Sequence, residues 1–281
     1  MTTSRTRCAS ALGAAALMST LALAACGSSD GDRDGAAAPA ASNSSGVTTI
    51  TEGKLKACTH LSYKPFEHKE GSKVVGFDVD LADLVAKELG VEQEVVDIEF
   101  ATITSGAAFA AKKCDMGYGA TTINDERKKA VLFSDPYFDS TAALMVKKGS
   151  GITDLAGLKG KKLGVQTDTT GQEFGEKEKD ANGFTPVVFE DLPSQLAAVL
   201  SGRVDGAIND NGPLLDYAKE NTGAEVVKEF DTGEQYGLMF KNNDANGTKL
   251  AELTNKVLAD AKADGRYNTI YKKWFGVDAP K

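Results

Sequence analysis

The chain has 281 residues and a formal net charge of −8 at neutral pH, with 41% hydrophobic residues. An acidic chain of this kind does not favour nucleic acid or an anionic membrane surface as a partner. From residue 47 onward the chain is long enough to bury one large or two small hydrophobic cores.

The first 25 residues are typical of a secretory signal. Arg5 and Arg7 precede an Ala-rich apolar stretch that is too short for a stable membrane span. This stretch ends in Leu23-Ala24-Ala25-Cys26, which looks like a lipobox, the motif in which the cysteine is acylated and becomes the new N-terminus. We expect residues 1–25 to be removed and Cys26 to anchor the protein to the outer face of the cell membrane. The alternative is an ordinary signal with a chance cysteine.

Residues 26–46 are dominated by small and polar residues. This composition cannot bury a core, so we expect a flexible linker after the lipidated cysteine. The folded part is expected to begin near Val47 and to continue to the end of the chain.

Two cysteines, Cys58 and Cys114, remain once the signal is removed and Cys26 is acylated. Each lies on a predicted strand of the same domain. In an oxidising compartment such a pair favours a disulfide, because neighbouring strands can present it at bridging distance. Two buried free thiols are the alternative. The only histidines are His60 and His68, without ligand spacing, so we expect no metal site.

The first half of the folded part is expected to alternate strands and helices. Apolar residues of the 78–89 segment recur with helical spacing, and Gly90 follows as a stop signal. The expected elements are strand 55–59, helix 78–89, strand 94–98, helix 103–111 and strand 114–119. This order predicts a parallel sheet with helices on both faces.

A second, similar unit follows. Its expected elements are strand 162–166, helix 170–179, strand 187–190, helix 192–200, strand 205–208 and helix 213–220. Two such units predict two lobes, connected by extended stretches at 142–147 and 236–241. We expect residues 47–143 and 239–281 to form lobe 1, and residues 144–238 to form lobe 2.

The C-terminal tail is expected to form two helices. The first covers residues 248–263, and Gly265 ends it. In the second, Tyr267, Tyr271 and Trp274 lie on one face with helical spacing. We expect these aromatic residues to be core rather than ligand contacts, and the tail to pack on lobe 1.

Six short motifs resemble, in order, those of the family 3 extracellular solute-binding proteins, the polar amino-acid receptors of ABC transporters. They are Tyr63-Lys-Pro-Phe-Glu67, Gly76-Phe-Asp-Val-Asp-Leu81, Lys112-Lys-Cys-Asp115, Thr122-Ile-Asn-Asp-Glu-Arg127, Phe133-Ser-Asp-Pro-Tyr137 and Gly265-Arg-Tyr-Asn-Thr-Ile-Tyr-Lys-Lys-Trp-Phe275. The last is most similar to glutamine-binding members. The resemblance implies the α/β, two-lobed periplasmic-binding-protein-like fold of type II. In this fold each lobe is a mostly parallel sheet flanked by helices, two crossover strands join the lobes, and the ligand binds between them.

The run from Gly119 to Phe138 carries the main chemical signal. It places small residues at a predicted strand end, a helix start just after, and Arg127 five residues past Thr122. A helix N-terminus and a guanidinium both suit a carboxylate. The resemblance implies that Arg127 clamps the ligand α-carboxylate and that Thr122 adds its N–H and hydroxyl. It also implies that Gly119 and Ala120 meet the ligand through their backbone, with Gly119 accepting from the ammonium. The alternative for Arg127 is a solvated helix face.

Asp210 matches the carboxylate that pairs with the ligand ammonium in the family. It follows a predicted strand of the second unit, at the sheet edge where ligands of open α/β sheets bind. The alternative is a helix cap. Thr169 and Thr170 match residues that close over the ligand. A zwitterion held by Arg127 and Asp210 would bridge the lobes and stabilise their closed arrangement.

The resemblance also assigns the side-chain pocket. Tyr63 matches one aromatic wall, and Phe100 supplies the other if two residues are inserted; without that insertion Thr102 takes the position. His60 falls where many relatives carry Asp, which argues against arginine or lysine as ligand. Two polar positions match side-chain contacts of the glutamine binders: Gln166 and Asn209. Glutamine or glutamate is the favoured ligand.

These features predict a lipid-anchored, extracytoplasmic, monomeric receptor without cofactor. It would capture a polar amino acid and deliver it to the membrane permease of an ABC importer. A cyclohexadienyl-dehydratase-like enzyme on the same scaffold is one alternative, and it requires a general acid, for which only His60 and a few carboxylates are available. An amino-acid sensor lipoprotein is another, because it would use the same closure.

Overall fold

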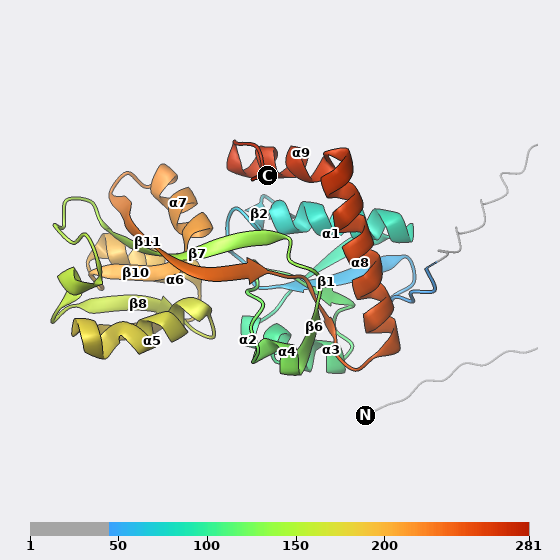
Figure 1. Ribbon diagram of the computed structural model, residues 1–281, viewed down its shortest axis with the longest axis horizontal. Helices are drawn as coiled ribbons and strands as arrows, with labels where there is room; N and C mark the ends of the chain where they lie inside the picture. The colour runs from blue at the N-terminus through green and yellow to red at the C-terminus, as the bar shows by residue number, and fades with distance from the viewer. Residues whose placement is uncertain (1–44, 281) are drawn as a thin grey trace, which may run out of the picture. The chain divides into compact units, whose positions relative to one another are not determined.

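A computed structural model describes residues 45–280 of the chain (Figure 1). The predicted signal at 1–25, the lipidation site Cys26 and nearly all of the 26–46 linker lie outside the described residues. Within the described part, no helix is both long and apolar enough to cross a bilayer.

The first sheet has five strands in the order β4-β1-β5-β12-β6. The strand β1 pairs in parallel with β4 and β5, whereas β12 pairs antiparallel with β5 and β6. Its strands are β1 (Lys54–Thr59), β4 (Glu92–Asp97), β5 (Met116–Gly117), β6 (Val131–Phe133) and β12 (Met239–Lys241). The other elements of this part are β2 (His68–Glu70), β3 (Lys73–Val75), α1 (Phe77–Leu89), α2 (Phe100–Thr104), α3 (Ala107–Ala110), α4 (Arg127–Ala130), α8 (Ala245–Asp264) and α9 (Arg266–Phe275).

The second sheet also has five strands, in the order β11-β7-β10-β8-β9. Here β8 pairs in parallel with β9 and β10, and β7 pairs antiparallel with β10 and β11. The strands are β7 (Phe138–Lys147), β8 (Lys162–Gln166), β9 (Thr185–Phe189), β10 (Gly206–Asp210) and β11 (Ala224–Tyr236). The helices are η1 (Leu155–Leu158), α5 (Thr170–Asn182), α6 (Leu192–Ser201) and α7 (Asn211–Glu220).

Two sheets flanked by helices form the two-lobed α/β fold that the sequence predicts. The long strands β7 and β11 run side by side and lead from one sheet to the other (Figure 1). We call them the crossover strands. The expected lobe boundaries at 143/144 and 238/239 fall within β7 and just after β11, and they stay a prediction.

Two local predictions were wrong. The helix expected at 103–111 is broken into α2 and α3 at Gly106, whose φ of +78° is a left-handed conformation. A side chain at this position would also meet the Ala130 carbonyl, because an added Cβ would lie 2.7 Å from its oxygen. The strand expected at 114–119 covers only Met116–Gly117.

The strand β11 was missed over most of its length. The sequence predicted an extended segment only from Tyr236, whereas the strand begins at Ala224. Its burial alternates weakly, and many of its side chains are charged and exposed. An edge strand of this kind lacks the apolar period on which strand prediction depends.

The C-terminal tail packs as expected. Helix α9 lies against α1 (Figure 1), and the Tyr267 and Tyr271 rings contact the buried Phe77 ring edge-on, with centroids 5.7 and 5.8 Å apart. Tyr267 is therefore part of the core, and Tyr271 and Trp274 pack against the core while partly buried, in agreement with the predicted packing face.

The disulfide is confirmed. Cys58 on β1 and Cys114, just before the neighbouring strand β5, are bridged with their Cα atoms 5.6 Å apart. Both side chains are buried against Ile103 and Phe109. The bridge therefore joins β1 to the segment that enters β5, and the short helices α2 and α3 pack against it.

Removing this cross-link should lower the free energy of unfolding by about 4 kcal/mol, because it closes a loop of 56 residues in the unfolded chain. We expect urea denaturation to show this loss in the Cys58→Ala/Cys114→Ala variant. Wild-type protein unfolded in reducing buffer is the control, since it keeps the sulfur atoms and loses only the bridge. A loss below about 1 kcal/mol in both would contradict the prediction.

Candidate functional site

One cavity collects side chains that come from both lobes. It contains about 380 Å³ of space between atoms, part of which is open to solvent. Its walls are His60, Tyr63, Glu67, Phe100, Gly119, Ala120, Thr122, Arg127, Gln166, Thr169, Thr170 and Asp210. All residues that the sequence assigned to ligand binding line this cavity, apart from Asn209.

Arg127 is a buried cation, since only 8% of the residue is exposed. Its Nη1 donates to the Thr122 carbonyl at 2.9 Å, and its Nη2 donates to the Asp168 carbonyl at 3.1 Å. Its guanidinium carbon lies 5.2 Å from the centre of the Phe100 ring. Among the described residues, no carboxylate lies within ion-pair distance of it. This burial excludes the solvated helix face.

The positive charge at this end of the cavity comes from Arg127 rather than from a helix N-terminus. The helix start expected in this run is a single turn, α4, which begins at Arg127 itself. The Arg127 N–H donates to Asn124 Oδ1 at 2.8 Å. Burial lowers the pKa of Arg127, while the charges of Glu173, Asp210 and Glu234 oppose the shift.

The Gly119–Ala120 turn forms the floor of the cavity. The Gly119 and Ala120 N–H groups donate to Asp78 Oδ2 at 3.2 and 2.8 Å. Ala120 has a φ of +46°, which a residue with a side chain rarely adopts. Because both N–H groups are used by the fold, only the carbonyls of this turn are available to meet a ligand.

Asp78 holds this turn from below. It lies in the first turn of α1, is fully buried, and also accepts a hydrogen bond from Tyr137 Oη at 2.7 Å. Burial raises the pKa of Asp78 to about 6, although the hydrogen bonds from Ala120, Tyr137 and Gly119 act in the opposite direction. The sequence placed Asp78 in a family motif without a role.

Asp210, the last residue of β10, supplies a buried carboxyl group to the cavity wall. It is 5% exposed, and its Oδ2 accepts a hydrogen bond from Tyr236 Oη at 2.5 Å. Asp210 precedes α7, but its side chain makes no capping hydrogen bond. Asp210 thus occupies the N-cap position of α7, but its carboxyl group does not cap the helix. Burial raises the pKa of Asp210, against the hydrogen bonds from Tyr236 and Tyr63 and the charge of Arg127.

Asn209 lies behind the cavity rather than in its wall. It is fully buried, and its Nδ2 donates to Gln166 Oε1 at 3.1 Å and to Gln195 Oε1 at 2.9 Å. Its Oδ1 accepts from Tyr63 Oη at 2.6 Å. Asn209 therefore orients two residues of the wall, Gln166 and Tyr63, instead of lining the wall itself.

The remaining predicted residues divide by whether the fold already uses their polar groups. Thr169 is the N-cap of α5, and its hydroxyl is bonded to Gln172 N and Gln166 O. His60 Nδ1 contacts the Ile98 carbonyl at 3.2 Å, whereas its buried Nε2 has no partner. Phe100 lines the cavity and Thr102 does not, as expected if two residues are inserted.

Two carboxyl groups at the site were not predicted. Glu67 lines the cavity and is 1% exposed, and its Oε2 has no hydrogen-bond partner among the described residues. Burial and the nearby Asp78 raise the pKa of Glu67.

Glu234, on β11, is the second of these groups, and it accepts a hydrogen bond from Thr122 Oγ1 at 3.4 Å. Burial, followed by the charge of Asp210, raises the pKa of Glu234 to about 7. Glu67 ends the first quoted motif and could have been found there.

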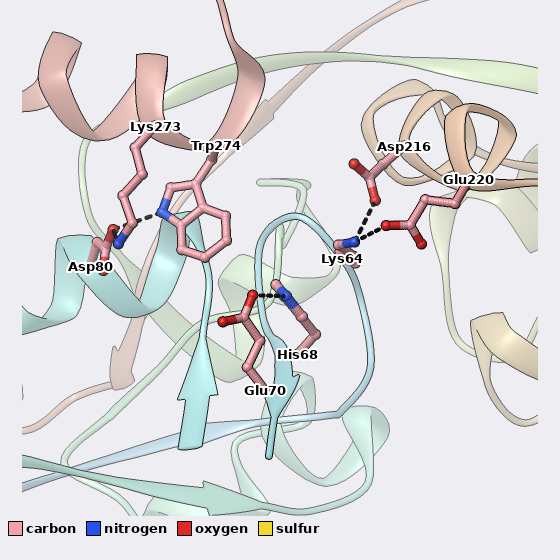
Figure 2. A network of polar contacts seen from close by, with 8 residues as sticks. All are labelled: Lys64, His68, Glu70, Asp80, Asp216, Glu220, Lys273 and Trp274. Atoms are coloured by element: carbon pink, nitrogen blue, oxygen red, sulfur yellow. Dashed lines mark hydrogen bonds and ion pairs between the residues drawn. The ribbon is translucent and has the colours of Figure 1, made fainter. Parts of the chain in front are cut away.

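Beside the cavity, Lys64 connects the loop that carries Tyr63 to helix α7 (Figure 2). Its Nζ pairs with Glu220 and lies 3.7 Å from Asp216 Oδ2. Lys64 belongs to the chain segment between β1 and β2, and α7 follows β10 in the second lobe, so these ion pairs join the lobes. On the other side of this loop, Lys273 and Trp274 of α9 both donate to Asp80 of α1 (Figure 2), with their nitrogen atoms 2.7 Å from Asp80 Oδ2.

Comparisons with known proteins agree with this geometry. Residues 55–277 match the bacterial extracellular solute-binding proteins, family 3. The arginine-binding extracellular protein ArtP of Bacillus subtilis (strain 168) is 33% identical over 258 residues, covering 91% of this chain and 93% of that protein. The glutamine-binding protein GlnH of the same organism is 35% identical over 215 residues, covering 75% and 77%.

The fold comparison gives the same result. The structure of an ancestral arginine-binding protein bound to arginine is similar with a TM-score of 0.73 and 39% sequence identity, covering 79% of this chain and 98% of that one. The match to the family spans nearly all of the described residues, and the cavity lies where the two lobes meet. The chain therefore belongs to family 3 of the bacterial extracellular solute-binding proteins.

Proposed function

We propose that the protein captures a free polar L-amino acid in this cavity and delivers it to the membrane permease of an ABC importer. In this proposal the lipid at Cys26 keeps the protein at the outer face of the membrane. The observation that carries it is a buried arginine, Arg127, which has no carboxylate partner among residues 45–280 and shares a cavity with a buried carboxyl group, Asp210.

A zwitterion satisfies both groups at once. A buried cation without a counter-charge is costly, and a ligand carboxylate supplies that charge to Arg127. A ligand ammonium does the same for Asp210 and favours its ionised form. Because the two groups come from different lobes, a ligand that contacts both stabilises the arrangement in which the lobes meet. The names of the relatives, which bind arginine or glutamine, support this reading.

The cavity favours a ligand side chain that donates hydrogen bonds. Glu67 Oε2 is buried without a partner and can accept such a bond. An ionised glutamate side chain only accepts hydrogen bonds, so it matches the unpaired Glu67 Oε2 less well than glutamine, and glutamate becomes the less favoured of the two expected ligands. Glutamine stays in the proposal. Arginine and histidine enter it because their side chains also donate hydrogen bonds and suit the unpaired Glu67 Oε2.

A binding role is favoured over a dehydratase on the same scaffold. The named relatives are binding proteins rather than enzymes. The binding proposal accounts for Arg127 and Asp210 without any bond being made or broken. A sensor that uses the same capture step differs only in the protein that receives the loaded form.

Arg127→Ala should weaken amino-acid binding by at least about 100-fold, because the ligand carboxylate would be buried without its charged partner. A thermal-shift screen of the mature protein against the twenty standard amino acids identifies the ligand, and calorimetry then compares the variants. Arg203→Ala is a matched control, since Arg203 also lies over an aromatic ring, Phe189, but outside the cavity. Near-normal affinity in Arg127→Ala would contradict the assigned site, and no shift with any amino acid would contradict the function.

Affinity should rise by roughly tenfold between pH 5 and pH 8. The ammonium is held best when Asp210 and Glu234 are ionised, and Glu234 has a pKa raised to about 7. Below that pH the ligand must displace protons, so its binding is weaker and releases protons to the buffer. Calorimetry in two buffers of different ionisation enthalpy measures this release. Glu234→Gln should make the pH dependence shallower; an affinity that is flat or falls with pH would refute the linkage.

Lys64→Met should weaken binding by about two- to fivefold at low ionic strength and have no effect at 1 M salt, because exposed ion pairs are modest and screened. The expected loss arises because Lys64 joins the two lobes. Lys256→Met is the control, since its partner Asp260 lies on the same helix, α8. Equal effects of both substitutions on the dissociation constant would show that the Lys64 ion pairs do not assist closure.

A further inference from the structure

Two tyrosines meet where the crossover strands leave the first lobe. Tyr137 directly precedes β7, and Tyr236 is the last residue of β11. The Tyr137 N–H donates to the Tyr236 carbonyl at 3.0 Å, and the two ring centres are 6.3 Å apart. Both residues are at most 2% exposed. They therefore form one buried unit, the crossover tyrosine pair.

Each phenol of this pair donates to a buried carboxyl group. Tyr236 Oη contacts Asp210 Oδ2 at 2.5 Å, and Tyr137 Oη contacts Asp78 Oδ2 at 2.7 Å. Asp210 lines the second lobe's side of the cavity, whereas Asp78 holds the Gly119–Ala120 floor of the first lobe's side. The two phenols thus reach both sides of the candidate site from a single point on the crossover strands.

We propose that the crossover tyrosine pair positions the amino-acid site. Tyr236 fixes the Asp210 carboxylate for the ligand ammonium, and Tyr137 fixes the Gly119–Ala120 turn through Asp78. This inference rests on the proposed function of the cavity. Neither tyrosine lines the cavity, so both act through other residues and are positioning residues rather than ligand contacts.

Contacts to β7 hold the Tyr236 side chain in place. Its ring stacks on Phe138 of β7, with planes 10° apart and centroids at 5.4 Å. Its Oη is also hydrogen-bonded to Ser140 Oγ of β7 at 2.7 Å. The phenol is therefore held by both crossover strands, and the Asp210 carboxylate oxygen that it contacts has a fixed position. A hydrogen bond to an ionised carboxylate is also stronger than a neutral one.

Tyr137 acts, through Asp78, on the backbone of the Gly119–Ala120 turn. Asp78 Oδ2 accepts the hydrogen bond from Tyr137 Oη. The same oxygen also accepts the hydrogen bonds from the Gly119 and Ala120 N–H groups. Those bonds hold Ala120 at a positive φ, and this conformation decides where the carbonyls of the turn point. Without the phenol, Asp78 has one fewer bond to fix its rotamer, and the turn has a less constrained position.

The test compares tyrosine-to-phenylalanine variants, which keep the rings and remove only the hydroxyls. The dissociation constants of L-arginine, L-glutamine and L-histidine are measured by calorimetry for Tyr236→Phe, Tyr137→Phe and the control Tyr118→Phe. Tyr118 is equally buried, and its Oη bonds to Gln93 Oε1 at 2.9 Å, outside the cavity. We expect roughly tenfold weaker binding of the bound amino acid in the first two variants and less than a twofold change in the control.

A double-mutant cycle separates positioning from general destabilisation. Tyr236→Phe should add no further loss to Asp210→Asn, because it acts through that carboxylate, and Tyr137→Phe should add none to Asp78→Asn. The pH midpoint of affinity provides a second readout. The groups that face Asp210 are Tyr63, Tyr236, Arg127 and Glu234. Loss of the Tyr236 donor should move the midpoint to higher pH, whereas Tyr118→Phe should leave it unchanged.

The possible results distinguish this inference from the proposed function. Wild-type affinity in both crossover variants would overturn the positioning role, as would losses that are additive with Asp210→Asn and Asp78→Asn. If all three phenylalanine variants lost the same affinity and the same melting temperature, the hydroxyls would be merely structural and the inference would be wrong. A wild-type protein that binds none of the twenty standard amino acids would contradict the proposed function itself and remove the basis of the inference.

Discussion

The arrangement of the site depends on the cost of burying one guanidinium. Arg127 is removed from water with two carbonyls and one aromatic ring around it, and no carboxylate of the described part of the chain pairs with it. These contacts satisfy some of its N–H groups and leave its charge uncompensated. One of the two carbonyls belongs to Asp168, in the second lobe. The same cation therefore contacts both lobes and creates the need for an anion between them.

The carboxyl groups at the cavity differ in how many hydrogen bonds the fold gives them. Glu67, Asp78 and Asp210 are all buried, and burial raises the pKa of each. Asp78 and Asp210 each have one oxygen held by hydrogen bonds from tyrosines or backbone N–H groups, whereas Asp78 Oδ1 and Glu67 Oε2 have no partner among the described residues. Of these two residues only Glu67 lines the cavity, so its unpaired oxygen is the one that a ligand can reach. A hydrogen-bond donor on the amino-acid side chain suits that position.

Much of this arrangement was accessible from the sequence, because spacing encodes it. The positions of Arg127 and Asp210 after strands of the two units placed them on facing edges. Asn209 was misplaced because a one-residue shift along a strand turns a side chain to the other face, where it contacts Gln195. Glu234 was missed because β11 is a polar edge strand without an apolar period. The break at Gly106 depends on contact with Ala130, which local propensity does not contain.

The order of strands in the first sheet has a consequence for how the chain folds. The strand β12 lies between β5 and β6, yet it is more than a hundred residues away from either in the sequence. The second sheet, in contrast, uses only residues between Phe138 and Tyr236. If the chain emerges from the membrane with its N-terminus first, β5 and β6 must wait with unpaired edges until residue 241 becomes available, while the second sheet already has all its strands. The second sheet is therefore the earliest complete folding unit, and the first sheet remains vulnerable to misassociation until the chain is nearly finished.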